Sequence, residues 1–256
     1  MAVFTLPPPL FGFFRENIEY LSDRAVDPDK LAHVIEGEAE RHFIDIDHYG
    51  EYPFKEMPRR WEEAAGKYSA DTLMKYGVLP WHIDRMVIRL SEAFADKDKE
   101  KILRLSAHLG HYVADACTPL HTTKHYNGIR PEQRGIHSLW ESRLPELFAE
   151  EYSYFAGRAD YTGNTLDMAW ELIEESHSMV NTIFSCYNSI YFSFPEDRIF
   201  SHEIRGRAAE REFSREFCKA IHECMEGMIE ERMLRAIKVT GDLWFTAWIM
   251  GGQPDL

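Results

Sequence analysis

The chain has 256 residues, of which 45% are hydrophobic, and a formal net charge of −14. A chain of this size buries a substantial core, and we expect one domain covering residues 1–256. The acidic balance argues against a stable nucleic-acid-binding surface, because such surfaces use Lys and Arg to neutralise phosphates. It does not exclude a phosphodiester substrate, since a bound metal cluster supplies positive charge locally.

The sequence also lacks the signals of a membrane-spanning or exported chain. No apolar run approaches the roughly 18 residues of a transmembrane helix. The opening residues, MAVFTLPPPLFGFF, lack the basic region and the small-residue cleavage site of a signal peptide, so the location of the protein stays open. The cysteines form no Cys-x-x-Cys pair, and we expect them to be thiols of the core: Cys117, Cys186, Cys218 and Cys224.

Helical periodicity dominates the chain after its Pro-rich opening, and no alternating run of strand length stands out. We therefore predict an all-α fold, a single-domain multi-helix bundle. The predicted helices span residues 13–22, 28–43, 55–75, 81–96, 98–118, 134–150, 166–190, 202–237 and 239–250.

Imidazoles and carboxylates are concentrated in the middle of the chain. His111 and Asp115 are four residues apart, as are His137 and Glu141, so each pair leaves one face of a helix. Pro119 ends the first of these helices, which frees His121 to point back toward the same place. Imidazole and carboxylate are zinc ligands, and the pattern predicts a multinuclear zinc hydrolase.

A surface role is the alternative for such pairs, because a His–Asp pair on an exposed helix face is ordinarily a solvated contact. Six of the twelve histidines, however, fall between His82 and His137 among apolar residues. Burying polar groups there without partners would be costly, which favours metal binding.

The order of these residues resembles the zinc-dependent phospholipase C family, which is related to the fungal-type zinc nucleases of single-stranded nucleic acids. The resemblance rests on HxxxDACTPLH at 111–121, on GIHSLWE at 135–141, and on ERHFIDID, which is similar to the family's HF-x-D-x-D element. It reaches faintly to the C-terminal LWFTAW segment and so covers nearly the whole chain.

The resemblance implies two zinc sites in this chain. The first would be held by Asp29, His42, His111 and Asp115, with Asp27 close enough to compete with Asp29. The second would be held by His121, His137 and Glu141. The catalytic candidates are Asp115 and Asp29, and we expect Asp29 to orient the attacking water or accept its proton.

In the family a third zinc shares the carboxylate matched by Asp115 and takes an N-terminal Trp amine and an early His. The first His here is His33 and the first Trp is Trp61. We therefore expect a chain that begins too late, which binds two zinc ions and has impaired activity, and an N-terminally extended form that binds three.

Other polar side chains near these ligands are candidates for orienting them or the substrate, since ligating histidines usually donate their second N–H to a neighbour. For each, an ordinary structural role is the alternative. They are Asp45, Asp47, His48 and His125, together with His82 as a weaker ligand candidate.

The expected substrate is a small phosphoester or phospholipid. A nuclease acting on single-stranded nucleic acid is the alternative, which Glu141 disfavours because the nuclease branch tends to carry Asp at that place. A catalytically weak helical protein that retains a zinc site is the second alternative.

Overall fold

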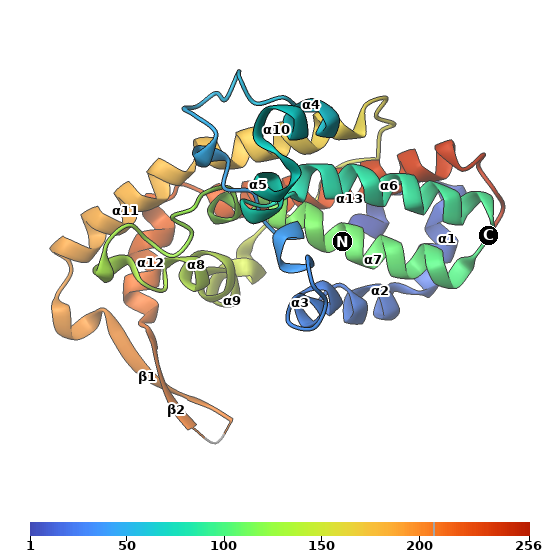
Figure 1. Ribbon diagram of the computed structural model, residues 1–256. Helices are drawn as coiled ribbons and strands as arrows, with labels where there is room; N and C mark the ends of the chain where they lie inside the picture. The colour runs from blue at the N-terminus through green and yellow to red at the C-terminus, as the bar shows by residue number, and fades with distance from the viewer. Residues whose placement is uncertain (207) are drawn as a thin grey trace.

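The computed structural model describes residues 1–206 and 208–256 (Figure 1). Its elements confirm the prediction of a mostly helical fold, with a single two-stranded sheet among the described residues. In chain order they are α1 (Pro8–Glu16), α2 (Ile18–Arg24), α3 (Asp27–Ala32), α4 (Trp61–Tyr68), α5 (Ala70–Lys75), α6 (Leu79–Ala95), α7 (Lys99–Cys117), α8 (Ile136–Ser138), α9 (Leu144–Phe148), α10 (Thr165–Ser178), α11 (Val180–Ser193), β1 (Phe200–Arg205), β2 (Ala208–Phe213), α12 (Arg215–Cys224) and α13 (Met228–Met250).

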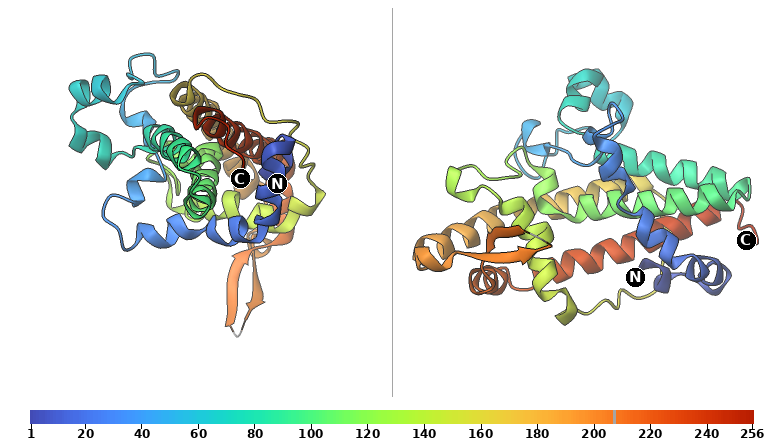
Figure 2. Two further views of the ribbon diagram at one scale, coloured as in Figure 1. Left: turned by 90° about the vertical axis from the view of Figure 1, so that its right-hand side faces the viewer. Right: turned by 90° about the horizontal axis from the view of Figure 1, so that it is seen from below.

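Four long helices, α6, α7, α10 and α13, pack against one another along their lengths (Figure 2). α6 and α7 follow the predicted bounds within two residues. Local chemistry explains this accuracy. Pro80 lies in the first turn of α6, and the Asp98 side chain caps α7 by accepting a hydrogen bond from the Lys101 amide at 3.0 Å.

Buried apolar side chains form two neighbouring cores. One lies among α6, α7, α10 and the C-terminal part of α13, and the other among α8, α9, α11 and α12. The helix α13 contributes to both, through Val239–Trp248 and through Met228 and Ile229. The chain passes from the first core to the second between Cys117 and Leu120, which is where the His/Asp pattern lies.

The predicted helices over 202–237 and 239–250 are wrong at the start of the first and at the boundary between them, because α12 ends at Cys224 and α13 continues from Met228 to Met250. Residue 207 lies outside the described residues. Phe200–Arg205 and Ala208–Phe213 form the antiparallel hairpin β1–β2, in which Phe200 pairs with Phe213, and it projects away from the bundle (Figure 1). Two features override the helix-forming Ala, Glu and Arg content. Gly206 adopts a positive φ of 64° at the turn, and the paired Phe rings stack with centroids 4.8 Å apart.

Other predicted helices are divided. The one over 28–43 ends at Ala32, and Gly37 with a φ of 76° follows in irregular chain. The one over 166–190 breaks at Met179, where the chain leaves one core for the other. The segments 13–22 and 55–75 are likewise divided into shorter helices. The segment 134–150 contains continuous helical turns over residues 136–148, with a π-helical turn in the middle.

The cysteine prediction is wrong for one pair. Cys186 of α11 and Cys224 of α12 form a disulfide, whereas Cys117 and Cys218 are buried free thiols as expected. The two cysteines are 38 residues apart in the sequence, and the packing of α11 on α12 brings their sulfurs together. The sequence alone therefore did not predict the disulfide.

Candidate metal centre

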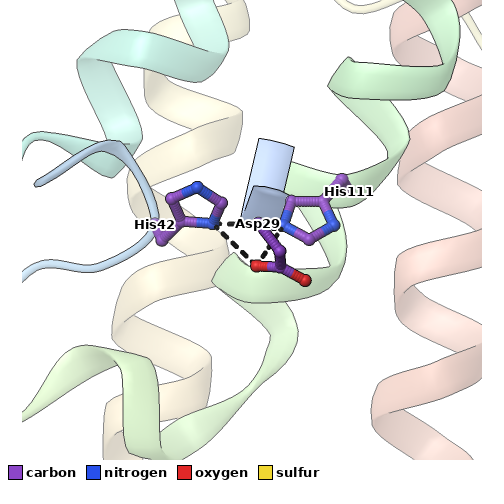
Figure 3. Close-up of side chains that lie close together, drawn as sticks. All are labelled: Asp29, His42 and His111. Carbon is purple, nitrogen blue, oxygen red and sulfur yellow. Dashed lines mark hydrogen bonds and ion pairs between the residues drawn. The ribbon is translucent and has the colours of Figure 1, made fainter. Parts of the chain in front are cut away.

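Asp29, His42 and His111 point toward one another from three separate segments (Figure 3). His111 comes from α7, Asp29 from α3, and His42 from the chain that follows the short 3₁₀ helix Ala39–Arg41. The Nδ1 of His42 lies 3.1 Å from the Nε2 of His111. The Oδ1 of Asp29 lies 3.6 Å from the first nitrogen and 3.4 Å from the second.

His121, His137 and Glu141 form a second group. His121 is in the 3₁₀ helix Pro119–Thr122, His137 is in α8, and Glu141 is in the π-helical turn Leu139–Arg143 that follows α8. The Nε2 of His121 lies 3.1 Å from the Nε2 of His137 and 3.4 Å from the Oε2 of Glu141. The Nε2 of His137 lies 2.6 Å from that same carboxylate oxygen.

Asp115 connects the two groups. Its Oδ2 lies 3.0 Å from the Nδ1 of His42 and 3.4 Å from the Nε2 of His111, and its Oδ1 lies 3.7 Å from the Nδ1 of His121. The carboxylate is almost fully buried. Its Oδ2 faces the first group, and its Oδ1 faces the His121 nitrogen that lies opposite the one facing His137 and Glu141. The seven side chains predicted as metal ligands therefore lie together in one place.

The backbone of one group orients a ligand of the other. The Nδ1–H of His121 donates to the carbonyl oxygen of His42 at 2.6 Å, and the amide of Ile44 donates to the carbonyl of His121 at 2.9 Å. The first bond fixes a proton on Nδ1, so Nε2 is the nitrogen that faces His137 and Glu141. This is the arrangement that metal-binding histidines adopt when a carbonyl holds their second nitrogen.

The spacing within the first group suits a cation, whereas the 2.6 Å between His137 and Glu141 in the second group is a hydrogen-bond distance. With bonds of about 2.0–2.2 Å, the ligand atoms around a tetrahedral zinc lie about 3.3–3.6 Å apart. The separations in the first group, 3.1, 3.4 and 3.6 Å, are close to that range. Each group also brings two imidazole nitrogens together beside carboxylate oxygens, an arrangement whose negative charge a metal ion would balance. Both groups could hold a metal ion.

The electrostatics of the site favour positive charge. Burial lowers the pKa of His121, but Asp115 and Glu141 outweigh it and raise that pKa to about 9. Burial also raises the pKa of Glu141, yet hydrogen bonds from His121 and His137 hold it well below its usual range. The pKa of His42 is raised in the same way, since Asp115 outweighs the effect of burial.

A buried shell that the sequence did not reveal surrounds the first group. The ring of Tyr112 packs edge-on against His111 and His82, and its hydroxyl donates to the carboxylate of Glu38. Glu38 is 3% exposed and also accepts from Arg41. It was missed because the predicted helix over 28–43 gave it no buried environment.

His82 lies in this shell and in neither metal group. Burial, with the positive charge of Arg41 as the next contribution, lowers its pKa to about 3, so the ring is neutral. Its Nε2 and the Nε2 of His42 are both buried without a hydrogen-bond partner among the described residues. His82 therefore packs against Tyr112, beside His111, and belongs to neither metal group.

Two cavities adjoin the ligands. One, of about 350 Å³, is lined by His42, His121 and His137 together with Asp45, Lys124 and Tyr126. The other, of about 190 Å³, is walled by His111, Asp115, Glu141 and Trp140. Ligand side chains are therefore reachable from two sides.

The remaining candidates have separate roles. Asp27 forms ion pairs with Arg24 at 3.2 Å and Lys30 at 2.9 Å, so Asp29 and not Asp27 joins the histidines. Asp47 accepts hydrogen bonds from the Thr123 hydroxyl and the Lys124 amide, and so holds the loop after His121.

His48 is exposed and stacks on Tyr76. The structure brings neither its ring nor that of His125 into a metal group. The Nδ1 of His177 lies 3.0 Å from the carbonyl oxygen of Thr122, the residue that follows His121.

Comparison with known proteins adds no relative. The chain matches no protein-family model and no curated protein. Among the described residues, no helix is both long and apolar enough to cross a membrane.

Proposed function

We propose that this protein is a zinc-dependent phosphodiester hydrolase of the phospholipase C-like type. The observation that carries the proposal is the convergence of two three-residue groups of imidazole and carboxylate beside the buried Asp115. Phosphodiesterases with paired metals hold the ions close together, and Asp115 keeps the two groups adjacent by contacting a histidine of each.

The donor set supports zinc. The two groups together with Asp115 offer four imidazoles and three carboxylates with no thiolate, and zinc is bound by histidine with aspartate or glutamate in many catalytic sites. When bound, such ions polarise a phosphoryl oxygen and lower the pKa of a coordinated water to about 7. Only three side chains form the second group, which suits a site that keeps a position for water or substrate.

Asp29 has the geometry of a proton acceptor. Its side chain is 66% exposed, although Oδ1 faces His42 and His111. The other oxygen, Oδ2, projects away from both imidazoles (Figure 3). In our proposal this oxygen orients the attacking water and accepts its proton, while the buried Asp115 holds position between the groups.

The 350 Å³ cavity supports a substrate with an anionic centre and an organic group. It opens beside His121 and His137, and its lining combines the Lys124 ammonium with the exposed ring of Tyr126. The ammonium would attract a phosphate and the ring would cover an apolar or planar group.

Two substrates and two variants test the proposal. Zinc-loaded protein is incubated with phosphatidylcholine vesicles, with release of phosphocholine measured, and separately with single-stranded DNA. We expect phosphocholine release that falls at least 100-fold in His121→Ala and is unchanged in the control His125→Ala, whose ring lies outside both groups. Digestion of the DNA without release of phosphocholine would show that the protein is a nuclease and not a phospholipase. Hydrolysis of neither substrate would leave a zinc-binding protein without this activity.

A further inference from the structure

The hairpin β1–β2 contacts the segment that contains His137 and Glu141 through Glu203 and Phe213. Arg143 follows Glu141 by two residues, ends the π-helical turn Leu139–Arg143, and is only 4% exposed. Its Nε donates to the backbone oxygen of Phe213, the last residue of β2, at 3.2 Å. A second guanidinium nitrogen donates to the carboxylate of Glu203 in β1.

Phe213 also lies near the other end of this segment. Gly135, which precedes α8, has a positive φ of 94°, and a side-chain carbon built on it would lie 3.5 Å from the ring of Phe213. Phe213 in turn stacks between Phe200 and Phe217. Phe213 therefore lies beside both ends of the segment 135–143, which contains His137 and Glu141, and is hydrogen-bonded to it at Arg143.

The buried side chain of Arg143, at the end of the π-helical turn, requires contacts from outside the segment. α8, the π-helical turn and α9 follow one another without a break over residues 136–148. A π-helical turn within a helix is rare and is often found at functional sites. The buried guanidinium of Arg143 requires partners, and it finds one on each strand of the hairpin and a third in Glu146 of α9 at 3.2 Å. The hairpin thus supplies two of the tertiary contacts at the end of the π turn.

We infer that the hairpin β1–β2 is a positioning element, which holds His137 and Glu141 in place for the second metal through Arg143, Glu203 and Phe213. The inference rests on the metal binding in our proposed function, but not on the reaction catalysed. Arg143 and Glu203 contact neither group directly; they act through the backbone of the π turn.

The first test needs no metal. Backbone hydrogen exchange is measured on the full metal-free chain for wild type, Glu203→Gln and Glu210→Gln. Glu210 is exposed and pairs with Glu203 across the hairpin, so its substitution makes the same charge change without touching Arg143. We expect exchange about tenfold faster at residues 136–144 in Glu203→Gln alone. Equal exchange in both variants would overturn the inference.

The second test measures Zn²⁺ binding by calorimetric titration. In Glu203→Gln, and in Arg143→Lys, one of the two binding steps should weaken by about tenfold or more, and the step assigned to Asp29, His42 and His111 should not change. Equal loss in both steps, or in Glu210→Gln, would indicate a general loss of stability and contradict the inference. A wild type without the second step would also contradict it. If the variants show the expected loss in one binding step but the wild type hydrolyses neither substrate, the proposed function is refuted and the inference stands.

Discussion

At the scale of single residues, the centre depends on how one buried carboxylate is shared. Asp115 places Oδ2 beside His42 and His111 and Oδ1 beside His121, at distances between 3.0 and 3.7 Å. The i, i+4 spacing from His111 was visible in the sequence. The sharing was not, because it depends on Pro119 and the following 3₁₀ turn, which bring His121 back toward the end of α7.

Asp29 and Asp27 form a matched pair for testing the ligand assignment. Both lie in α3, but Asp29 faces the histidines whereas Asp27 pairs with Arg24 and Lys30. We expect Asp29→Asn to weaken zinc binding in the first group by about 100-fold and Asp27→Asn to leave it within about twofold, as measured by titration with a competing chelator. The reverse order would assign the ligand to Asp27.

Asp45 makes stability depend on pH. Burial, followed by repulsion from Asp47, raises the pKa of Asp45 to about 6 from 3.8. The folded state holds this proton more tightly than the unfolded state. The contribution of Asp45 to the free energy of unfolding is therefore fully present below about pH 4 and is lost as the pH rises through about 6. Asp45→Asn removes the charge and should stabilise the protein above that range.

The expected gain is about 1 kcal/mol at pH 7.5, since partial exposure reduces the effect, and about zero at pH 3.5. Urea unfolding of the metal-free protein at both pH values measures it. Other titrating groups cancel in the difference between variant and wild type. A gain that is equal at both pH values would contradict the assignment.

At the scale of elements, sequence reasoning succeeded where local signals and burial agree. α6 and α7 have clear amphipathic periods and start signals, so their bounds were predictable. It failed where long-range contacts decide. The hairpin depends on pairing Phe200 with Phe213, and the π-helical turn at Glu141 contacts that hairpin through Arg143. The His, Asp and Glu side chains of the two groups could be predicted from the sequence, but the buried polar residues around them, such as Glu38, could not.

The disulfide gives a prediction about α11 and α12. Cross-linking Cys186 to Cys224 closes a 38-residue loop, which should contribute about 2–4 kcal/mol to the free energy of unfolding. The double variant Cys186→Ser/Cys224→Ser should therefore unfold at lower urea concentration, and a reductant should shift the wild type but not the variant. Labelling of unfolded, unreduced protein should count two thiols; four would show that the bond is absent.

At the scale of the whole molecule, the centre lies where the two cores meet. His111 and Asp115 project from a helix of the first core, and His137 and Glu141 from short helices of the second. A bound metal pair would therefore join the two cores, and its binding energy would add to folding stability. In a chain with a net charge of −14, it would also supply the local positive potential that a phosphodiester requires.

The central claim is that both groups hold zinc, and zinc stoichiometry tests it most directly. The purified chain is stripped with a chelator, reloaded and measured by elemental analysis beside His121→Ala and His125→Ala. We predict two zinc ions per chain in wild type and in His125→Ala, and one in His121→Ala. A wild type that retains no zinc, or a His121→Ala protein that retains as much as wild type, would contradict the account.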